Sequence, residues 1–288
     1  MDATELIKRV RRIEIKTKGL SQQIFAGEYH SAFKGRGMAF SEVREYQYGD
    51  DVRNIDWNVT ARFNNPYIKI FEEERELTVM LLVDVSASRD FGTSKQLKKN
   101  LITELSAVLA FSTIQNNDKI GVVMFSDKIE KFIPPKKGKQ HVLRIIRELI
   151  DFKPESKGTD IAAGLKYFNN VIKKRSTAFL ISDFIDSNYE DAVKIASKKH
   201  DIIALNIFDE REAELPPVGL IHMVDAETGK MIWVDSSRRA TRDAYKKHWN
   251  NRQENIGDIF NKYGIDSARI NTSDDYIKPL MNLFKKRM

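Results

Sequence analysis

From residue 77 onward, short apolar runs alternate with longer segments in which apolar residues recur at helical spacing. The run TVMLLVDV, at 78–85, is typical of a strand that is buried on both faces of a sheet. In the segment 95–115 apolar residues return every three or four positions, which predicts a helix. Strands alternating with helices predict an α/β fold, with a mostly parallel sheet and helices on both faces. The predicted strands are 78–85, 118–127, 176–184, 201–209 and 265–270, and the predicted helices are 95–115, 139–152, 158–174, 188–200, 238–263 and 274–287. Residues 129–138 alternate only briefly and then turn at Pro134 and Pro135.

Two other parts of the chain depart from this alternation. Residues 218–235 form two β-like runs around the turn AETG, which predicts a hairpin inserted in the domain. Residues 1–76 begin with a helical stretch and continue through glycine-bearing segments without a regular period. We therefore predict an α/β domain over 77–288 and an N-terminal extension over 1–76 that packs on it.

Composition limits the chemistry that this chain can perform. Among its 288 residues there is no cysteine, which excludes disulfides, cysteine-ligated zinc and thiol catalysis. The N-terminus has no apolar core of a signal peptide, and no apolar run approaches the roughly 18 residues of a membrane span. A cytoplasmic protein with no transmembrane segment is expected.

The net charge of +7 is concentrated near the C-terminus, where residues 236–288 hold 12 basic and 6 acidic side chains. A solvated helix face is the simpler interpretation. Nucleic-acid binding is the alternative, but it would require basic residues interleaved with exposed aromatics on a recognised module, and the sequence contains no such module.

Polar side chains follow the first buried strand at alternate positions. Asp84, Ser86 and Ser88 are two residues apart, so an extended chain directs them to one side. Thr159 precedes a predicted helix, and Asp183 ends another apolar strand. Ligand sites of parallel sheets lie at the carboxyl ends of strands, and these oxygen donors suit Mg²⁺ first, with Mn²⁺ or Ca²⁺ as alternatives. With few carboxylates, such a site would have room for an acid from another molecule.

These residues resemble the metal-ion-dependent adhesion site of von Willebrand factor A domains, in which D-x-S-x-S is followed by a threonine and then an aspartate. The matching positions are Asp84, Ser86, Ser88, Thr159 and Asp183. The resemblance implies that both serines, and Thr159 with them, hold the metal directly, while the two aspartates act through water. It also implies a von Willebrand A-like fold and a non-enzymatic module that binds an acidic partner residue.

A narrower resemblance extends over nearly the whole chain. The segments GRGMAFSEVREYQYGDDVRNIDWNVTAR, GTDIAAGL and LISDF are similar to a bacterial family named domain of unknown function fifty-eight. Its most specific mark is R-x-Y-x-x-G-D-D-x-R-x-I-D-W. Members are commonly encoded beside MoxR-type AAA+ ATPases, so the resemblance implies such an ATPase, and other von Willebrand A-domain proteins, as partners.

The signature segment combines arginines, aspartates and aromatic rings. One interpretation is an internal network of ion pairs and stacked rings, which suits the forked guanidinium of arginine. The other is a partner-docking surface, to which Arg89 beside the proposed metal would also contribute. The candidate docking residues are Arg44, Tyr48, Asp50, Asp51, Arg53, Asp56, Trp57, Arg62 and Arg89.

Motifs of common enzymes are missing from the sequence. There is no G-x-S-x-G nucleophile elbow and no G-x-x-x-x-G-K-[ST] phosphate loop. Position 86 is serine, where a haloacid-dehalogenase phosphatase would require a second aspartate. A metal-dependent hydrolase stays open as an alternative, because a bound ion is able to activate water.

Overall fold

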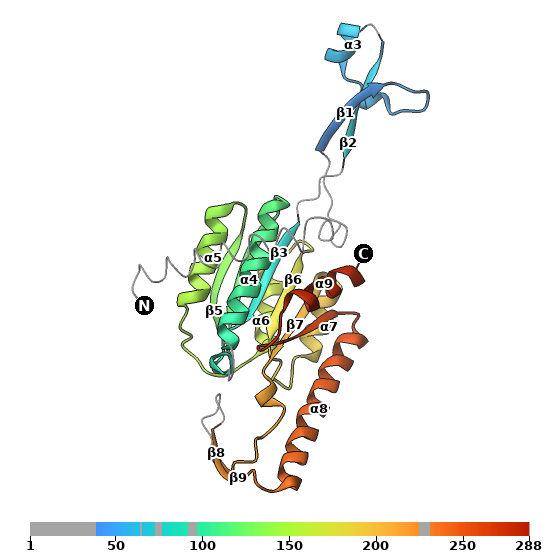
Figure 1. The fold of residues 1–288 in the computed structure, drawn as a ribbon. Coiled ribbons are helices and arrows are strands. Elements are labelled where there is room, and N and C mark those ends of the chain that lie inside the picture. The colour runs from blue at the N-terminus through green and yellow to red at the C-terminus, as the bar shows by residue number, and fades with distance from the viewer. Residues whose placement is uncertain (1–38, 64, 73–76, 92–96, 225–230, 288) are drawn as a thin grey trace. The chain divides into compact units, whose positions relative to one another are not determined.

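The computed structural model describes residues 39–63, 65–72, 77–91, 97–224 and 231–287 (Figure 1). They divide into two compact units, one within 33–77 and the other within 78–288. The helix predicted at the N-terminus and the AETG turn lie outside the described residues. No helix of the described ranges is both long and apolar enough to cross a membrane.

The larger unit is built on a six-stranded sheet with the order β10-β7-β6-β3-β4-β5. Five strands are parallel, and β5 joins β4 in the antiparallel direction. The inner strands are continuous apolar runs because helices cover both of their faces. The strands are β3 (Thr78–Asp84), β4 (Lys119–Phe125), β5 (Ile129–Lys136), β6 (Thr177–Ser182), β7 (Asp201–Phe208) and β10 (Asp266–Asn271).

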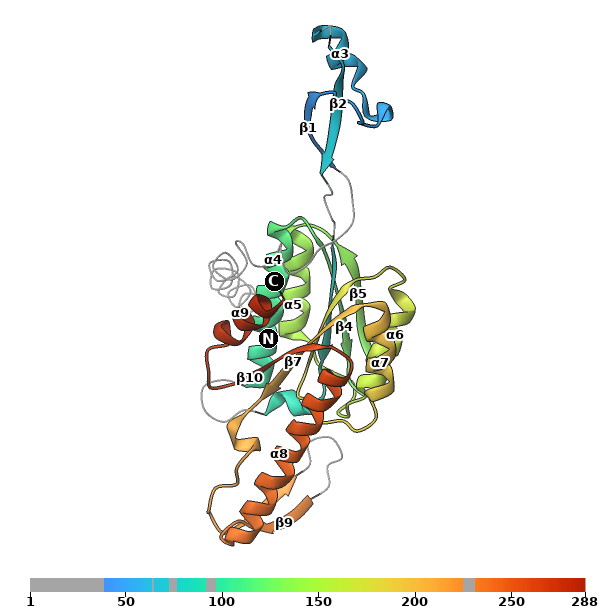
Figure 2. The same ribbon diagram turned by 90° about the vertical axis from the view of Figure 1, so that its right-hand side faces the viewer.

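Helices cover both faces of this sheet (Figure 2). On one face, α6, α7 and the C-terminal half of α8 share a core with alternate side chains of the strands. On the other face lie α4, α5 and α9, where Phe284 of α9 meets Phe179 of β6 with ring centroids 6.4 Å apart. The helices are α4 (Lys98–Gln115), α5 (Lys139–Asp151), α6 (Ile161–Val171), α7 (Glu190–Lys199), α8 (Arg239–Lys262) and α9 (Ile277–Lys286).

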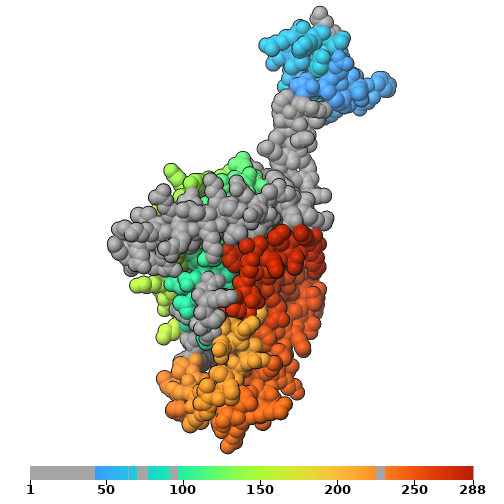
Figure 3. Space-filling model, viewed as in Figure 1, coloured from blue at the N-terminus to red at the C-terminus, as the bar shows by residue number. Residues whose placement is uncertain are grey.

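The predicted hairpin is present as β8 (Leu220–Val224) and β9 (Met231–Asp235), which pair in the antiparallel direction. The hairpin and α8 lie on the surface, coloured orange in Figure 3. Many basic side chains of this region are paired with acids: Arg238 with Asp235, Lys246 with Glu214, and Lys262 with Glu190. The charge excess of the C-terminal region is therefore partly neutralised by carboxylates elsewhere in the domain.

The smaller unit contains the antiparallel pair β1 (Ala39–Glu45) and β2 (Tyr67–Glu72), with a 3-10 turn η1 (Val52–Asn54) and helix α3 (Trp57–Phe63) between them. The strand pair was not predicted, because its two strands are separated by more than twenty residues and the intervening segment shows no period. The predicted packing of this segment on the α/β domain stays a prediction.

His200 provides a pH test of the packing between α6 and α7. Its ring is 1% exposed, lies 4.3 Å from the Phe168 ring and shares a 3.0 Å hydrogen bond with Ser176. Burial, together with the charges of Lys199 and Arg175, lowers its pKa to about 4. An unfolded histidine titrates near 6.5, so the stability from neutral His200 is full above that pH and is lost as pH falls through 4.

We expect His200→Leu to reduce the fall in the free energy of unfolding between pH 7.5 and 4.5 by up to about 3 kcal/mol. Urea denaturation at the two pH values measures this fall. His248→Leu is the matched control, because His248 is exposed on α8. An equal fall in wild type and His200→Leu would contradict the assignment.

Candidate metal centre

The candidate centre lies where β3 and β6 end side by side. Asp84 is the last residue of β3, Ser182 is the last of β6, and the strands are in parallel register with Val83 opposite Ile181. The chain leaves β3 through α4 to reach β4 on one side, whereas β6 lies on the other side. The site is therefore at the point where the strand order reverses, the usual ligand position in such sheets.

Asp84 is a buried carboxylate with two hydrogen bonds. It is 3% exposed, it accepts from the Ser86 backbone N–H at 2.9 Å, and the Ser182 hydroxyl donates to its other oxygen at 2.6 Å. Burial and the negative charge of Asp183 nevertheless raise the pKa of Asp84 to about 7. Two acids thus share a region of low polarity, where added positive charge would favour ionised Asp84.

The two serines of the D-x-S-x-S loop face one another. Their hydroxyl oxygens are 3.0 Å apart, with Ser86 buried and Ser88 half-buried. Two neighbouring ligands of an octahedral Mg²⁺, each about 2.1 Å from the ion, would be separated by about 3 Å. The two hydroxyls share a hydrogen bond at this distance, and their spacing matches that of two adjacent ligands of a divalent cation.

Hydrogen bonds hold the neighbouring loops against this pair. The Ala87 backbone N–H donates to the Lys157 carbonyl at 3.0 Å, and the Ile161 N–H donates to the Asp186 carboxylate at 2.9 Å. Asp160 caps α6 by accepting from the Ala163 N–H at 2.7 Å. Thr159 is half-buried within this joined set of loops. Its role as a metal ligand stays a prediction.

Asp183 forms a buried ion pair that the sequence reasoning missed. The Lys98 ammonium lies 2.9 Å from one Asp183 oxygen, and the Ile185 backbone N–H donates to the other at 3.3 Å. Lys98 is only 1% exposed. Burial disfavours its charge, but the carboxylates of Asp183 and Glu212 outweigh burial and raise the Lys98 pKa. Lys98 begins α4 on the same stripe as Leu101, Ile102 and Leu105, a position that could have indicated a buried lysine.

The second acid on Lys98 is Glu212, at 2.5 Å. It belongs to the 3-10 turn η3 (Glu210–Glu212) that follows β7, and burial raises its pKa. Its other oxygen accepts from the Asp209 backbone N–H at 3.0 Å, while Asp209 caps the turn. Glu212 is therefore held rigidly beside the ammonium.

Comparison with known proteins identifies the family. A model described as "Protein of unknown function DUF58" matches residues 42–255. The chain belongs to this family. The DUF58 protein is 27% identical over 290 residues to the uncharacterized protein Rv1480 of Mycobacterium tuberculosis, covering all of this chain and 91% of that protein. It is 28% identical over 109 residues to the uncharacterized protein YeaD of Bacillus subtilis, covering 38% of this chain and 25% of YeaD.

A solved structure shares the fold of the DUF58 protein. An aerotolerance-related membrane protein from Bacteroides fragilis aligns with a TM-score of 0.50 and 17% identity, over 73% of this chain and 99% of that chain. The predicted α/β fold, with a mostly parallel sheet and helices on both of its faces, is confirmed.

Arg89 does not form part of an exposed docking surface of the DUF58 protein, contrary to the expectation from sequence. The side chain is 5% exposed, and its guanidinium donates to the Phe152 carbonyl at 2.8 Å and lies 5.9 Å from the Phe152 ring. The loop after α5 therefore buries Arg89. Lys98, which the sequence did not single out, pairs with the site carboxylate of Asp183.

The other candidate docking residues divide into two groups. Arg44 and Asp50 form a two-pronged ion pair at 2.8 Å, Asp51 caps η1, and Asp56 caps the start of α3. These contacts agree with an internal network. The exposed group consists of Tyr48, Arg53, Trp57 and Arg62. Trp57 is 70% exposed, and Tyr48 is fully exposed.

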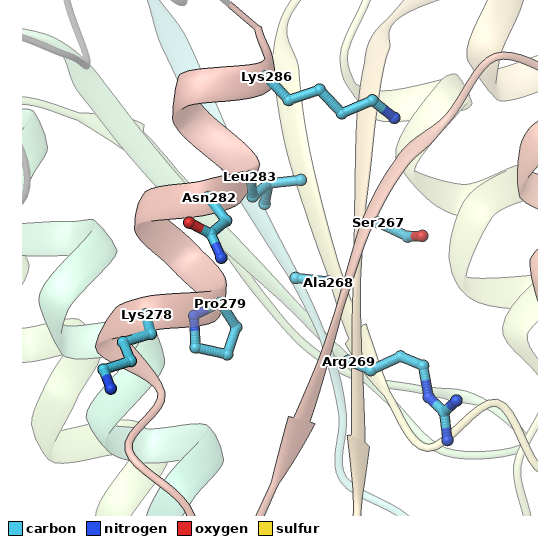
Figure 4. A pocket seen from close by; sticks show the side chains of 8 residues that line it. All are labelled: Ser267, Ala268, Arg269, Lys278, Pro279, Asn282, Leu283 and Lys286. Carbon is cyan, nitrogen blue, oxygen red and sulfur yellow. The ribbon is translucent and has the colours of Figure 1, made fainter.

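A separate hollow lies between α9 and the edge strand β10 (Figure 4). It carries the basic side chains of Arg269, Lys278 and Lys286. Arg269 stacks on Phe208 and Trp249, with its guanidinium carbon 5.0 and 5.4 Å from the ring centroids. The hollow is at the sheet's edge, two strands away from β6, and shares no residue with the candidate metal centre.

Proposed function

We propose that the DUF58 protein is a non-enzymatic interaction module that holds an acidic side chain of a partner through a divalent cation. The observation that carries this proposal is the Ser86–Ser88 hydroxyl pair, spaced at 3.0 Å beside the buried Asp84 carboxylate. Ser86, Ser88 and Thr159 would hold the ion, with Asp84 and Asp183 bound through water. When present, the ion supplies an open coordination position for an outside carboxylate.

Loss of one hydroxyl tests the metal part of the proposal. We expect Mg²⁺ and Mn²⁺ to bind the wild-type protein in isothermal titration, and Ser86→Ala to weaken binding by at least about tenfold. Ser197→Ala on α7 removes a hydroxyl distant from the centre in sequence and should leave the affinity unchanged. No binding to wild type, or equal affinities for wild type and Ser86→Ala, would refute a metal site at this loop.

The proposed partner is a MoxR-type AAA+ ATPase, or another von Willebrand A-domain protein, in the cytoplasm. This identity rests on the family resemblance, and the exposed Tyr48 and Trp57 add a second surface for contact. Affinity capture with purified MoxR-type ATPase should succeed in Mg²⁺ and fail in EDTA or with Ser86→Ala. If EDTA does not change the amount of ATPase captured, binding of this partner does not depend on the metal.

The arrangement of charges favours this function over hydrolysis. A metal-dependent hydrolase would require a base beside the ion, but Asp183 is engaged by Lys98 and by the Ile185 N–H. Asp84 is engaged by Ser86 and Ser182. Phosphoester or peptide hydrolysis that disappears in Asp183→Ala would reverse this preference.

A further inference from the structure

We propose that Lys98 is a resident counter-ion of the metal centre. Its ammonium pairs with Asp183 when no metal is bound, and this pairing lowers the affinity of the centre for divalent cations. Glu212 holds the ammonium when a divalent cation takes over Asp183. This inference rests on the proposed function, because it assigns a regulator to the same site.

The position of Lys98 is specific rather than incidental. Its ammonium is fully buried and bridges two carboxylates, at 2.9 Å from Asp183 and 2.5 Å from Glu212. A buried lysine is stable only when such partners compensate the loss of water. The two acids come from different strand ends, so the cation connects the end of β6 to the turn after β7.

The positive charge of Lys98 on Asp183 is expected to affect how strongly the centre binds a metal ion. Within the described ranges, no three histidine, cysteine, aspartate or glutamate side chains form a cluster that could hold a metal ion. The candidate centre relies on neutral hydroxyls and few carboxylates, so each carboxylate matters for affinity. An ammonium on Asp183 offsets the charge of that carboxylate and repels a divalent cation placed nearby.

Glu212 gives the ammonium a second place to bind. If Lys98 were paired with Asp183 alone, weakening that pair would leave a buried cation without compensation. Because Glu212 already contacts the ammonium and is anchored by the Asp209 N–H, Lys98 is able to keep one partner while Asp183 turns to a metal.

Backbone contacts join the start of α4, where Lys98 lies, to the D-x-S-x-S loop. The Lys98 N–H donates to the Phe91 carbonyl at 3.0 Å, and the Phe91 N–H donates to the Ser88 carbonyl at 3.2 Å. The backbone of Lys98 is therefore anchored to the segment that carries Ser88, a proposed metal ligand.

Two substitutions should shift cation affinity in opposite directions, measured by isothermal titration with Mn²⁺ and by thermal unfolding in EDTA and in Mg²⁺. Lys98→Met removes the competing charge, so Mn²⁺ should bind at least about tenfold tighter, and Mg²⁺ should raise the melting temperature more than in wild type. Glu212→Gln leaves Lys98 entirely on Asp183, so Mn²⁺ should bind at least about tenfold more weakly. Lys98→Arg keeps the charge and should remain within threefold of wild type.

If Lys98→Met does not fold in EDTA, the Mn²⁺ affinity of Glu212→Gln still tests the inference, because glutamine has nearly the same shape as glutamate. A purely structural role for Lys98 would lower stability in both variants without opposite shifts in affinity. Where the wild type binds Mn²⁺, the inference is overturned if Lys98→Met binds it no tighter than wild type, or if Glu212→Gln binds it no more weakly.

Failure of the inference is distinguishable from failure of the proposed function. If wild type binds Mn²⁺ but the variants do not diverge, only the role of Lys98 is lost. If wild type binds no cation and Lys98→Met binds one, the inference stands and the metal-dependent function is lost. If neither binds, both are overturned.

Discussion

Asp84→Asn is expected to abolish divalent-cation binding and, at the same time, to stabilise the metal-free protein at pH 8. The carboxylate is buried and faces the charge of Asp183, which together raise its pKa from 3.8 to about 7. The protonated form is thus preferred in the folded state. The contribution of protonated Asp84 to folding stability is fully present below pH 3.8, and this contribution is lost as pH rises through 7.

The asparagine would avoid this loss because it carries no charge at any of these pH values. The gain at pH 8 is on the order of 3 kcal/mol in the free energy of unfolding. The hydrogen bonds survive, since the amide oxygen is able to accept from the Ser86 N–H while the Ser182 hydroxyl accepts from the amide nitrogen. Urea denaturation in EDTA measures the stability, and calorimetric titration with Mg²⁺ measures the binding.

Asp127→Asn is the matched control for the loss of one carboxylate near the same edge of the sheet. Asp127 is exposed in the turn after β4, so neither stability nor cation affinity should change appreciably. If Asp84→Asn retained wild-type affinity, Asp84 would not be part of a metal centre. If the variant were less stable than wild type in EDTA at pH 8, the ionised Asp84 carboxylate would not destabilise the metal-free protein.

Gly121→Val is expected to destabilise the protein by at least about 3 kcal/mol, and to prevent folding if the domain is marginally stable. A Cβ atom at Gly121 would lie 2.8 Å from the Ile133 carbonyl oxygen, 2.8 Å from the Met80 sulfur and 2.9 Å from the Pro135 nitrogen. Two of these atoms belong to the backbone of β5, at an irregularity in its pairing with β4, so they cannot move aside as a side chain would.

Gly257→Ala supplies the opposite control. Gly257 is within α8, and an added Cβ there meets no atom within 4 Å. Alanine should therefore stabilise the helix by about 0.5–1 kcal/mol. Chemical denaturation of the two variants separates crowding at β4 from the general effect of replacing glycine. Gly121→Val with wild-type stability would mean that β5 lies farther from β4.

Prediction from sequence succeeded where the signal is local. The apolar run that becomes β3 and the helical spacing that becomes α4 reflect burial of each segment's own side chains, so their type is encoded within about twenty residues. The donor chemistry of Asp84, Ser86 and Ser88 is also local, because alternation along an extended chain places the three on one side. The pair of strands in the smaller unit escaped prediction, since its partners are far apart along the chain.

Arg89 and Lys98 show where local signals end. The sequence placed a cation beside the proposed metal because Arg89 directly follows Ser88. The structure turns Arg89 toward Phe152, 63 residues away, and brings Lys98 to Asp183 instead. Which cation meets which carboxylate depends on the packing of α4 and α5 against the sheet. Spacing along the chain carries no information about that packing.

By itself, the sequence determined the alternation of strands and helices, the family to which the chain belongs, and the set of hydroxyls and carboxylates proposed to hold a metal. Only the tertiary structure decided the electrostatics of that set. It joined Lys98 to Asp183 across 85 residues and to Glu212 across 114, and it buried Asp84 next to Asp183. The reason is physical: side-chain periodicity is set by neighbours in the chain, whereas Coulomb energies and desolvation are set by distances and burial that arise only when the strands assemble.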